Sequence, residues 1–585
     1  MAIRCPRACL LVGSLLLPHV AAAQTAPTDM VPPIESMTAP PASELRDAVE
    51  RYVEDRSALF RRYAVPFAPE RRERLEEFYR GWQQRLQEMS YDELGVEGRI
   101  DWVLLDHRLR YELETLEREG RELAEMQDLL PFATTIIELE RERRDMKPVD
   151  ARGSAERLVR LVEDLERTRT TLESATTDGN GAHSRIVAFR AVGATADLRQ
   201  VLEGWYRNYA GYDPLFGWWV EDPFNDANAA LEAYESFLRE ELVGIRPGQP
   251  EPIIGDPIGT EGLRSDLNVE MIPYTPAELI EIAEREFAWC EAEMLKASRE
   301  MGFGDDWRAA LEKVKTLHVE PGRQPEVVRD LAHEAVAFLE QHDLVTIPPL
   351  AEEIWRIEMM SPERQLVNPF FTGGETIRVS YPTDEMEHAD KLMSMRGNNP
   401  HFSRATVHHE LIPGHHLQGF MTDRYNSHRE VFRTPFWGEG WALYWEMLLW
   451  DMGFPRTPED RVGFLFWRSH RAARIIFSLS FHLGTMTPEE AMDFLVERVG
   501  HEPANAEAEV RRSFNGTYPP LYQAGYMLGG LQIRALHRDL VESGRMTNRE
   551  FHDAILRGGR MPIEMVRARL LGERVGRDYR ANWRF

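Results

Sequence analysis

Apolar and charged residues recur with the period of an α-helix along most of the chain. Two long segments, Arg71–Met89 and Ile100–Met126, show this alternation clearly. The glutamate and arginine runs between the apolar positions are typical of solvated helix faces. The pattern therefore predicts a mostly α-helical protein. A further apolar stripe at helical spacing consists of Leu279, Ile282, Phe287, Cys290 and Met294.

Several helices have starts that can be located from the sequence. Thr275-Pro-Ala-Glu278 places a capping threonine, a proline in the first turn and a glutamate at the third helical position. Thr487-Pro-Glu-Glu490 and Thr547-Asn-Arg-Glu550 have the same arrangement of threonine and glutamate. We expect a helix to begin just after each of these threonines.

Two interruptions of the helical pattern bear on how the chain is organised. The segment from Arg246 to Thr260 is rich in proline and glycine, which predicts either a boundary between two lobes near 246–260 or a long surface loop. Thr376–Tyr381 alternates in the manner of a β-strand. This strand could bind a substrate backbone along its edge, or it could be one arm of a hairpin.

The N-terminus has the features of a secretory signal. A positively charged start precedes the apolar run Leu10–Leu17, and small residues offer a cleavage site near Ala23. We expect residues 1–23 to be the signal peptide, residues 24–42 a flexible leader rich in proline and alanine, and residues 43–585 the helical body. The mature protein is then expected to be exported, either periplasmic or secreted.

Charge and cysteine content narrow the possible classes of protein. The formal net charge of -27 at pH 7 repels nucleic acid and anionic membrane surfaces, so we expect no nucleic-acid partner. We also expect no membrane-spanning segment in the mature chain. Cys5 and Cys9 precede the apolar run of the signal, which argues against a lipoprotein. Cys290 is then left alone, so we expect a packed core thiol and no disulfide bond.

One segment concentrates residue types that bind and activate metals. Neutral imidazole is a good ligand for zinc, and a carboxylate beside the first ligand can accept a proton from water. This is the chemistry of His-Glu-x-x-His zinc sites on helices, and histidines with a purely structural role are the alternative interpretation. Residues 406–418 contain His408, His409, Glu410, His415 and His416.

The spacing of these histidines differs from that motif, because Pro413 and Gly414 interrupt the helix. On an uninterrupted helix, residues seven apart share a face, which would align His409 with His416. A break at the proline and glycine would instead bring His415 round to His409. The sequence leaves both arrangements open.

A zinc site of this kind needs a third protein ligand, and a later segment offers one. Glu439 and Glu446 are seven residues apart and share the face of a strongly apolar helix. A carboxylate buried on such a face needs a partner, since burying it alone is costly. We therefore predict that Glu439 is a metal ligand and that Glu446 orients a ligand without binding the metal itself.

Three stretches of the chain match motifs of one bacterial family. They are His409-Glu-Leu-Ile-Pro-Gly-His415-His-Leu-Gln418, Glu439-Gly-Trp-Ala-Leu-Tyr-Trp-Glu446 and Tyr522-Gln-Ala-Gly-Tyr-Met-Leu-Gly529. With them the chain resembles the "domain of unknown function 885" family from roughly Ser43 to its C-terminus. That family is similar to the all-helical zinc carboxypeptidases of the Taq type and to thimet-like oligopeptidases.

The resemblance implies roles for individual residues. His409, His415 and Glu439 are expected to bind Zn2+, and Glu410 is expected to be the general base. In the Taq type, a glutamate ligand is followed seven residues later by another glutamate, which is the spacing of Glu439 and Glu446.

Three further residues are candidates for contacts with the substrate. Tyr526, in the third motif, and His482, in an apolar segment, could donate hydrogen bonds to the developing oxyanion, and His482 could also hold the substrate. Arg474 could pair with a substrate carboxylate, although an ordinary salt bridge also accounts for it.

We therefore predict a mostly α, two-lobed, zincin-like metallopeptidase fold with a small β element beside the active-site helix. The predicted function is zinc-dependent hydrolysis of peptide bonds in short peptides, with Glu410 as general base. One alternative is a helical di-iron oxidase, for which Glu385-Met-Glu-His388 supplies one of the two Glu-x-x-His pairs required. The other is a non-catalytic exported binding protein that retains the fold.

Overall fold

The computed structural model describes residues 42–177, 183–361, 364–365 and 370–585 of the chain. The predicted signal peptide and nearly all of the predicted leader lie outside the described residues. Those that are described are mostly helical, as the sequence predicts, and their buried apolar side chains form two large clusters.

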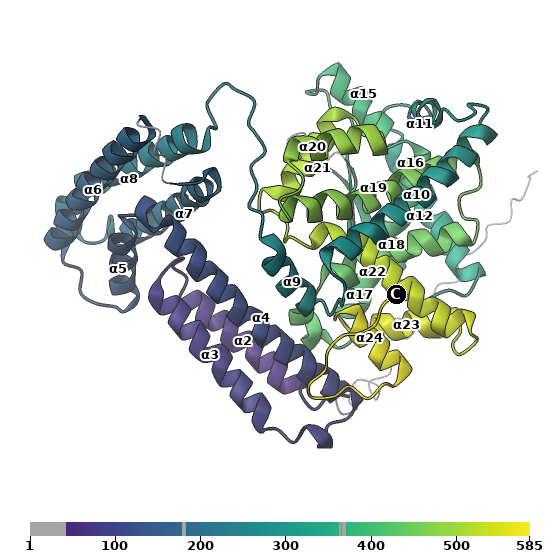
Figure 1. Ribbon diagram of the computed structural model, residues 1–585, viewed down its shortest axis with the longest axis horizontal. Coiled ribbons are helices and arrows are strands. Elements are labelled where there is room, and N and C mark those ends of the chain that lie inside the picture. The colour runs from purple at the N-terminus through teal and green to yellow at the C-terminus, as the bar shows by residue number, and fades with distance from the viewer. Residues whose placement is uncertain (1–41, 178–182, 362–363, 366–369) are drawn as a thin grey trace, which may run out of the picture.

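The helices of the N-terminal part form two groups (Figure 1). Helices α2, α3 and α4 lie side by side, and their apolar faces join the larger hydrophobic core. Helices α5 to α8 form a bundle with a separate core, in which Leu198, Leu202 and Phe216 are fully buried. The bounds are α2 Arg46–Arg62, α3 Pro69–Glu88, η2 Tyr91–Glu93, α4 Val96–Met126, η3 Gln127–Leu129, α5 Ala133–Arg144, α6 Ala151–Thr177, α7 Arg185–Tyr209, α8 Pro214–Phe237 and η4 Leu238–Val243.

The remaining helices form the main body, at the right of Figure 1. The longest of them, α10 and α19, pack along each other through the larger core. The bounds are α9 Gly259–Val269, α10 Pro276–Glu300, α11 Trp307–Lys315, α12 Gln324–Gln341, α13 Pro349–Ile354, α15 His388–Gly397, α16 Pro400–Glu410, α17 His415–Thr422, η5 Ser427–Phe432, α18 Pro435–Asp451, α19 Pro458–His482, α20 Pro488–Phe494, η6 Leu495–Val499, α21 Pro503–Phe514, α22 Tyr522–His537, η7 Arg538–Glu542, α23 Asn548–Gly558 and α24 Ile563–Leu571.

The predicted helix starts are confirmed. Thr275, Thr487 and Thr547 each accept a hydrogen bond from the backbone N–H of the glutamate three residues later. In return, that glutamate accepts a hydrogen bond from the backbone N–H of the threonine, which completes a capping box at the start of α10, α20 and α23. Cys290 on α10 is fully buried, as expected of a core thiol.

The segment rich in proline and glycine connects the α5–α8 bundle to α9 in the main body (Figure 1). Arg190 of α7 holds this segment in place by donating hydrogen bonds of 2.5 and 2.6 Å to both carboxylate oxygens of Asp256. The connection therefore runs between two hydrophobic cores and is bonded to both parts, since Arg511 of α21 donates a hydrogen bond of 2.7 Å to the carbonyl oxygen of Glu251. The division of the protein into two lobes at this point stays a prediction.

A small parallel sheet lies against α16. Its strands are β1 (Arg356–Met359) and β2 (Thr376–Val379). The parallel pairing shows that β2 is not an arm of a hairpin with β1, and its other edge is partly occupied by a bridge to Thr372. Ile377 of β2 belongs to the same buried cluster as Val407 of α16. The strand predicted from the sequence thus supports the helix that carries the first histidines.

Within the part of the chain that the structure describes, no helix combines the length and the apolar character that a membrane span requires.

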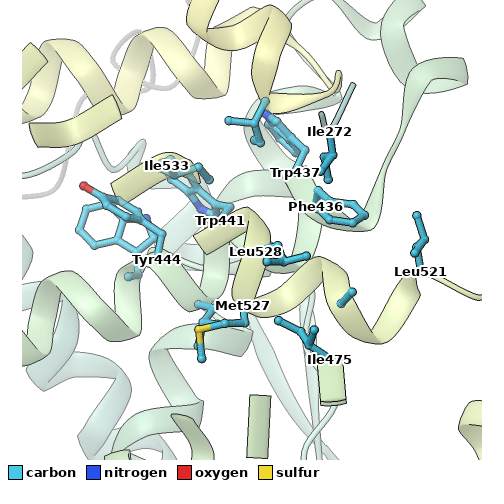
Figure 2. Close-up of a cluster of buried hydrophobic side chains, with 14 of the residues drawn as sticks. Ile272, Phe436, Trp437, Trp441, Tyr444, Ile475, Leu521, Met527, Leu528 and Ile533 are labelled. Carbon is cyan, nitrogen blue, oxygen red and sulfur yellow. The ribbon is translucent and has the colours of Figure 1, made fainter. Parts of the chain in front are cut away.

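Helices α18 and α22 meet at very short range in the middle of the larger core. Trp441 of α18 and Leu528 of α22 are packed together there (Figure 2). At the crossing, a Cβ atom on Gly440 would lie 2.5 Å from the Cα atom of Gly529, closer than such atoms can approach. Only glycine therefore allows this contact, which places Glu439 directly beside α22.

This contact makes a specific prediction about stability. We expect Gly440→Ala to lower the thermal unfolding midpoint, because the added methyl group forces two helix backbones apart at a cost of about 1–3 kcal/mol. Gly438→Ala is the matched control on the other side of Glu439, since a Cβ there meets no atom within 4 Å. Its midpoint should stay unchanged or rise, because alanine favours the helix by up to about 1 kcal/mol. Equal midpoints for the two variants would contradict the packing argument.

Candidate metal centre

The break between α16 and α17 determines where the histidines point. The α16 hydrogen bonds end at Leu411, the Ile412–Pro413 peptide bond is cis, and the Gly414 N–H donates to the carbonyl of His408 at 3.0 Å. A Cβ on Gly414 would lie 1.8 Å from the carbonyl oxygen of His409, so the chain can turn back this closely only with glycine at that position. The turn brings the start of α17 against the end of α16.

Three side chains converge as a result of this turn. Nε2 of His415 lies 3.1 Å from Oε2 of Glu439, and Nε2 of His409 lies 3.7 Å from the same oxygen. The two imidazole rings are nearly perpendicular, with centroids 4.9 Å apart. Within the described residues, this is the one group of three such side chains whose donor atoms all lie within 4.8 Å of one another.

The spacing of these donor atoms suits a zinc ion. Two ligands that each lie about 2.0–2.1 Å from a tetrahedral zinc are about 3.3 Å apart, and the distances of 3.1 and 3.7 Å from the Glu439 oxygen bracket that value. Two imidazoles and one carboxylate are also a donor set that zinc enzymes use while leaving a fourth position for water. The residues present therefore fit the metal that the resemblance implies.

The neighbouring histidines of each pair point elsewhere. Nε2 of His416 donates to the carbonyl oxygen of Ala351 at 2.6 Å, and Nδ1 of His408 donates to the carbonyl oxygen of Arg404 at 2.9 Å. Burial lowers the pKa of His408 to about 4, so its ring is neutral. Of the two arrangements that the sequence left open, the structure has the one in which a break brings His415, and not His416, to His409.

A second carboxylate orients the first imidazole. Oε1 of Glu446 accepts a hydrogen bond of 2.6 Å from Nδ1 of His409, which leaves Nε2 of that ring facing Glu439. Burial alone would raise the pKa of Glu446, but the hydrogen bond and charge of His409 outweigh it and keep the pKa below its usual value. A carboxylate behind a ligand imidazole fixes its tautomer and raises its basicity, which is the role predicted for Glu446.

The three side chains line a cavity of about 340 Å3, and Glu410 also lines it. Gly373, before β2, lies so close to Glu410 that a Cβ would come within 2.3 Å of its carboxylate. Burial is the largest influence on Glu410 and raises the pKa of its carboxyl group. Such a carboxylate is a stronger base than one in water, as general-base chemistry requires.

The structure adds a residue that sequence reasoning missed. The hydroxyl of Tyr522 donates a hydrogen bond to Oε1 of Glu439, so it holds the carboxylate from the side opposite the histidines. The available signal was the four-residue spacing of Tyr518, Tyr522 and Tyr526, whose first two rings are stacked 4.3 Å apart. Of these three tyrosines, the sequence predicts a role in the site for Tyr526 alone.

Of the three residues predicted to contact the substrate, Tyr526 and Arg474 line the cavity and His482 does not. Tyr526 lines the cavity, and its ring lies nearly parallel to that of His409 with 6.3 Å between the centroids. His482 does not line it, because it lies eleven residues beyond Arg471 on α19, roughly 16 Å along the helix axis. Burial lowers the pKa of His482 to about 4, so it is a neutral residue of the interior.

The residues proposed for a di-iron site lie at the surface. Glu385 and His388 are exposed at the start of α15. Neither belongs to a group of potential metal ligands among the described residues.

These observations define the class of protein: a mostly helical fold whose described residues form one candidate metal centre, in a small cavity. The chain belongs to the family described as "Bacterial protein of unknown function (DUF885)", which matches residues 61–570. This match confirms the family resemblance found in the sequence. Among proteins with curated functions, none matches the chain.

Two solved structures have a similar fold. One is a candidate lipoprotein of unknown function from Shewanella oneidensis, with a TM-score of 0.66, 18% identity, and coverage of 91% of this chain and 100% of that one. The other is a candidate lipoprotein from Colwellia psychrerythraea, with a TM-score of 0.58, 15% identity, and coverage of 91% and 99%. At these identities the likeness extends to the fold alone.

Proposed function

We propose that this protein is a zinc-dependent hydrolase of peptide bonds in short peptides. The observation that carries the proposal is the convergence of His409, His415 and Glu439 within 4.8 Å, in a cavity that also holds the carboxylate of Glu410. Two imidazoles, a ligand carboxylate and a free carboxylate are the parts of a metallopeptidase centre.

Individual residues of the chain have separate roles in the proposed hydrolysis. When bound, zinc supplies Lewis acidity, which polarises a carbonyl group and lowers the pKa of water. Glu410 takes the proton from the attacking water and delivers it to the amine that leaves. Glu446 and Tyr522 keep His409 and Glu439 in position through the hydrogen bonds described above.

Two features of the cavity indicate how a substrate would bind: the position of Tyr526 and the volume. Tyr526 is the side chain best placed to donate to the oxyanion, since it lines the cavity beside His409. A volume of about 340 Å3 is at the small end of ligand pockets, which favours short peptides or chain ends over folded proteins.

We also propose that the protein is exported, to the periplasm or the medium. The charged and apolar start of the sequence supports this, and the description of both structural neighbours as candidate lipoproteins agrees with it. A lipid anchor is not proposed for this chain, because Cys5 and Cys9 precede the apolar run.

Metal analysis combined with a peptide-library digest tests the proposed function. We expect one zinc per chain in protein purified without added metal, and cleavage products that mass spectrometry detects and a chelator abolishes. Two irons per chain would instead indicate a di-iron oxidase. A zinc-loaded protein that cleaves no member of the library would indicate a binding protein.

A further inference from the structure

One wall of the cavity carries a concentration of positive charge that the proposed hydrolysis does not use. Arg471 and Arg474 of α19 and Arg512 of α21 line it, together with two carboxylates, Glu410 and Glu439. Arg471 and Arg474 are only 5% and 3% exposed, so their guanidinium groups are held away from bulk water. Burying a guanidinium group is costly unless it is fully paired.

Two of these guanidinium groups are not fully paired. Among the described residues, nothing accepts a hydrogen bond from Nε of Arg471 or from Nη1 of Arg474, and both atoms are buried. A buried donor without an acceptor costs about 1–3 kcal/mol, so two of them on arginines that line one cavity call for an explanation. A ligand with acceptor oxygens is the simplest one.

The two nearest carboxylates each make a hydrogen bond to another side chain. Glu509 accepts a hydrogen bond of 2.6 Å from Nε of Arg474, and it also binds Arg512. Glu446 lies 4.0 Å from Arg471, but its oxygen is the one that binds His409 at 2.6 Å. Within the described part of the chain, Arg471 is hydrogen-bonded to no carboxylate and has only the distant ion pair with Glu446, so this wall can attract an additional anion.

The position of the wall limits what that anion can be. The guanidinium carbons of Arg471 and Arg474 lie 4.7 and 4.5 Å from the ring centre of Tyr526. That ring lies 6.3 Å from the ring of His409. The path from the ring of His409 through the ring of Tyr526 to either guanidinium group gives an upper limit on their separation. This limit equals about three residues of extended chain, at about 3.5 Å per residue. Contacts at both ends take up part of this span, which leaves room for one or two residues.

We propose that Arg471 and Arg474 bind the C-terminal carboxylate of the substrate peptide, so that cleavage removes one or two residues from the carboxyl end. This inference rests on the proposed function and names its substrate class, which is peptides with a free carboxyl terminus. The planar fork of a guanidinium group matches a carboxylate, and both arginines line the cavity in which the peptide would bind.

A pair of peptides that differ only at the C-terminus tests this proposal. Acetyl-tetraalanine with a free carboxylate should be cleaved with a kcat/KM on the order of 10²-fold higher than its C-terminal amide, as expected for losing a charged hydrogen-bonded pair. Arg471→Lys should reduce this preference, since lysine keeps the charge but loses the fork. Arg468→Lys is the matched control: Arg468 is a buried arginine one turn earlier on α19, and it pairs with Glu286 outside the cavity.

A binding measurement separates this inference from the proposed hydrolysis. Calorimetric titration of chelator-treated protein should show tighter binding of the acid than of the amide in the wild type and in Arg468→Lys, but not in Arg471→Lys. Cleavage of both peptides at equal rates would overturn the inference and leave the proposed function standing. Acid-selective binding without any cleavage would overturn the proposed function, and with it the cleavage at the carboxyl end, but would leave the binding of the C-terminal carboxylate by the two arginines standing. An amidated peptide ending in glutamate that is cleaved as well as the free acid would overturn the assignment to the C-terminal carboxylate.

Discussion

His415→Ala is expected to lower the affinity for zinc by on the order of 10²–10³-fold. Zinc sites with four protein ligands bind with about 10–16 kcal/mol, so the loss of one ligand costs a few kcal/mol. Nε2 of His415 lies 3.1 Å from the Glu439 carboxylate, and no other histidine can replace it, because the ring of His416 faces away from the cavity. Zinc titration against a competing chelator measures the effect directly.

His416→Ala is the matched control for this experiment. The change is the same and lies at the next residue, but the lost hydrogen bond is the one to the carbonyl oxygen of Ala351. We expect its zinc affinity to stay at the wild-type value and its thermal unfolding midpoint to fall, since a buried carbonyl loses its donor at a cost of about 1–3 kcal/mol. If His416→Ala lost zinc and His415→Ala retained it, the assignment of the ligands would be wrong.

The sequence predicted best those features that local chemistry decides. Thr275 and Glu278 define a helix start by themselves, because their two hydrogen bonds are made within one turn. Glu439 could be proposed because a carboxylate flanked by apolar residues needs a partner. The choice between His415 and His416 could not be made, since it depends on the backbone path through residues 411–414, and the pattern shows only that a break occurs there.

The features that sequence reasoning missed depend on contacts between distant parts of the chain. Tyr522 donates to a carboxylate 83 residues earlier, and that contact exists only because Gly440 and Gly529 let two helices touch. The anion-binding character of Arg471 depends in the same way on partners from other helices. The sequence could not place His482 for a related reason: apolar surroundings indicate burial, but they do not say which part of the interior a residue occupies.

Glu410→Gln is expected to reduce peptide turnover by about 10²–10⁴-fold, the usual contribution of a general base, while zinc stays bound. Glutamine has nearly the same shape as glutamate but cannot accept a proton. The side chain lines the cavity, and it is not among the three side chains whose donor atoms converge, so the metal should keep all its protein ligands. Turnover of a cleaved library peptide and the zinc content of the same sample are the two measurements needed.

Glu334→Gln provides the matched control, since it is the same chemical change in a carboxylate outside the cavity. Glu334 accepts hydrogen bonds of 3.0 and 2.9 Å from Arg404 of α16. Its turnover should stay within a few-fold of the wild type, because weakening this ion pair affects the helix that carries Glu410 without touching the cavity. Loss of zinc from Glu410→Gln would make Glu410 a ligand instead of the base. Full turnover in Glu410→Gln with zinc bound would mean that another group accepts the proton, and the assignment of Glu410 as general base would be wrong.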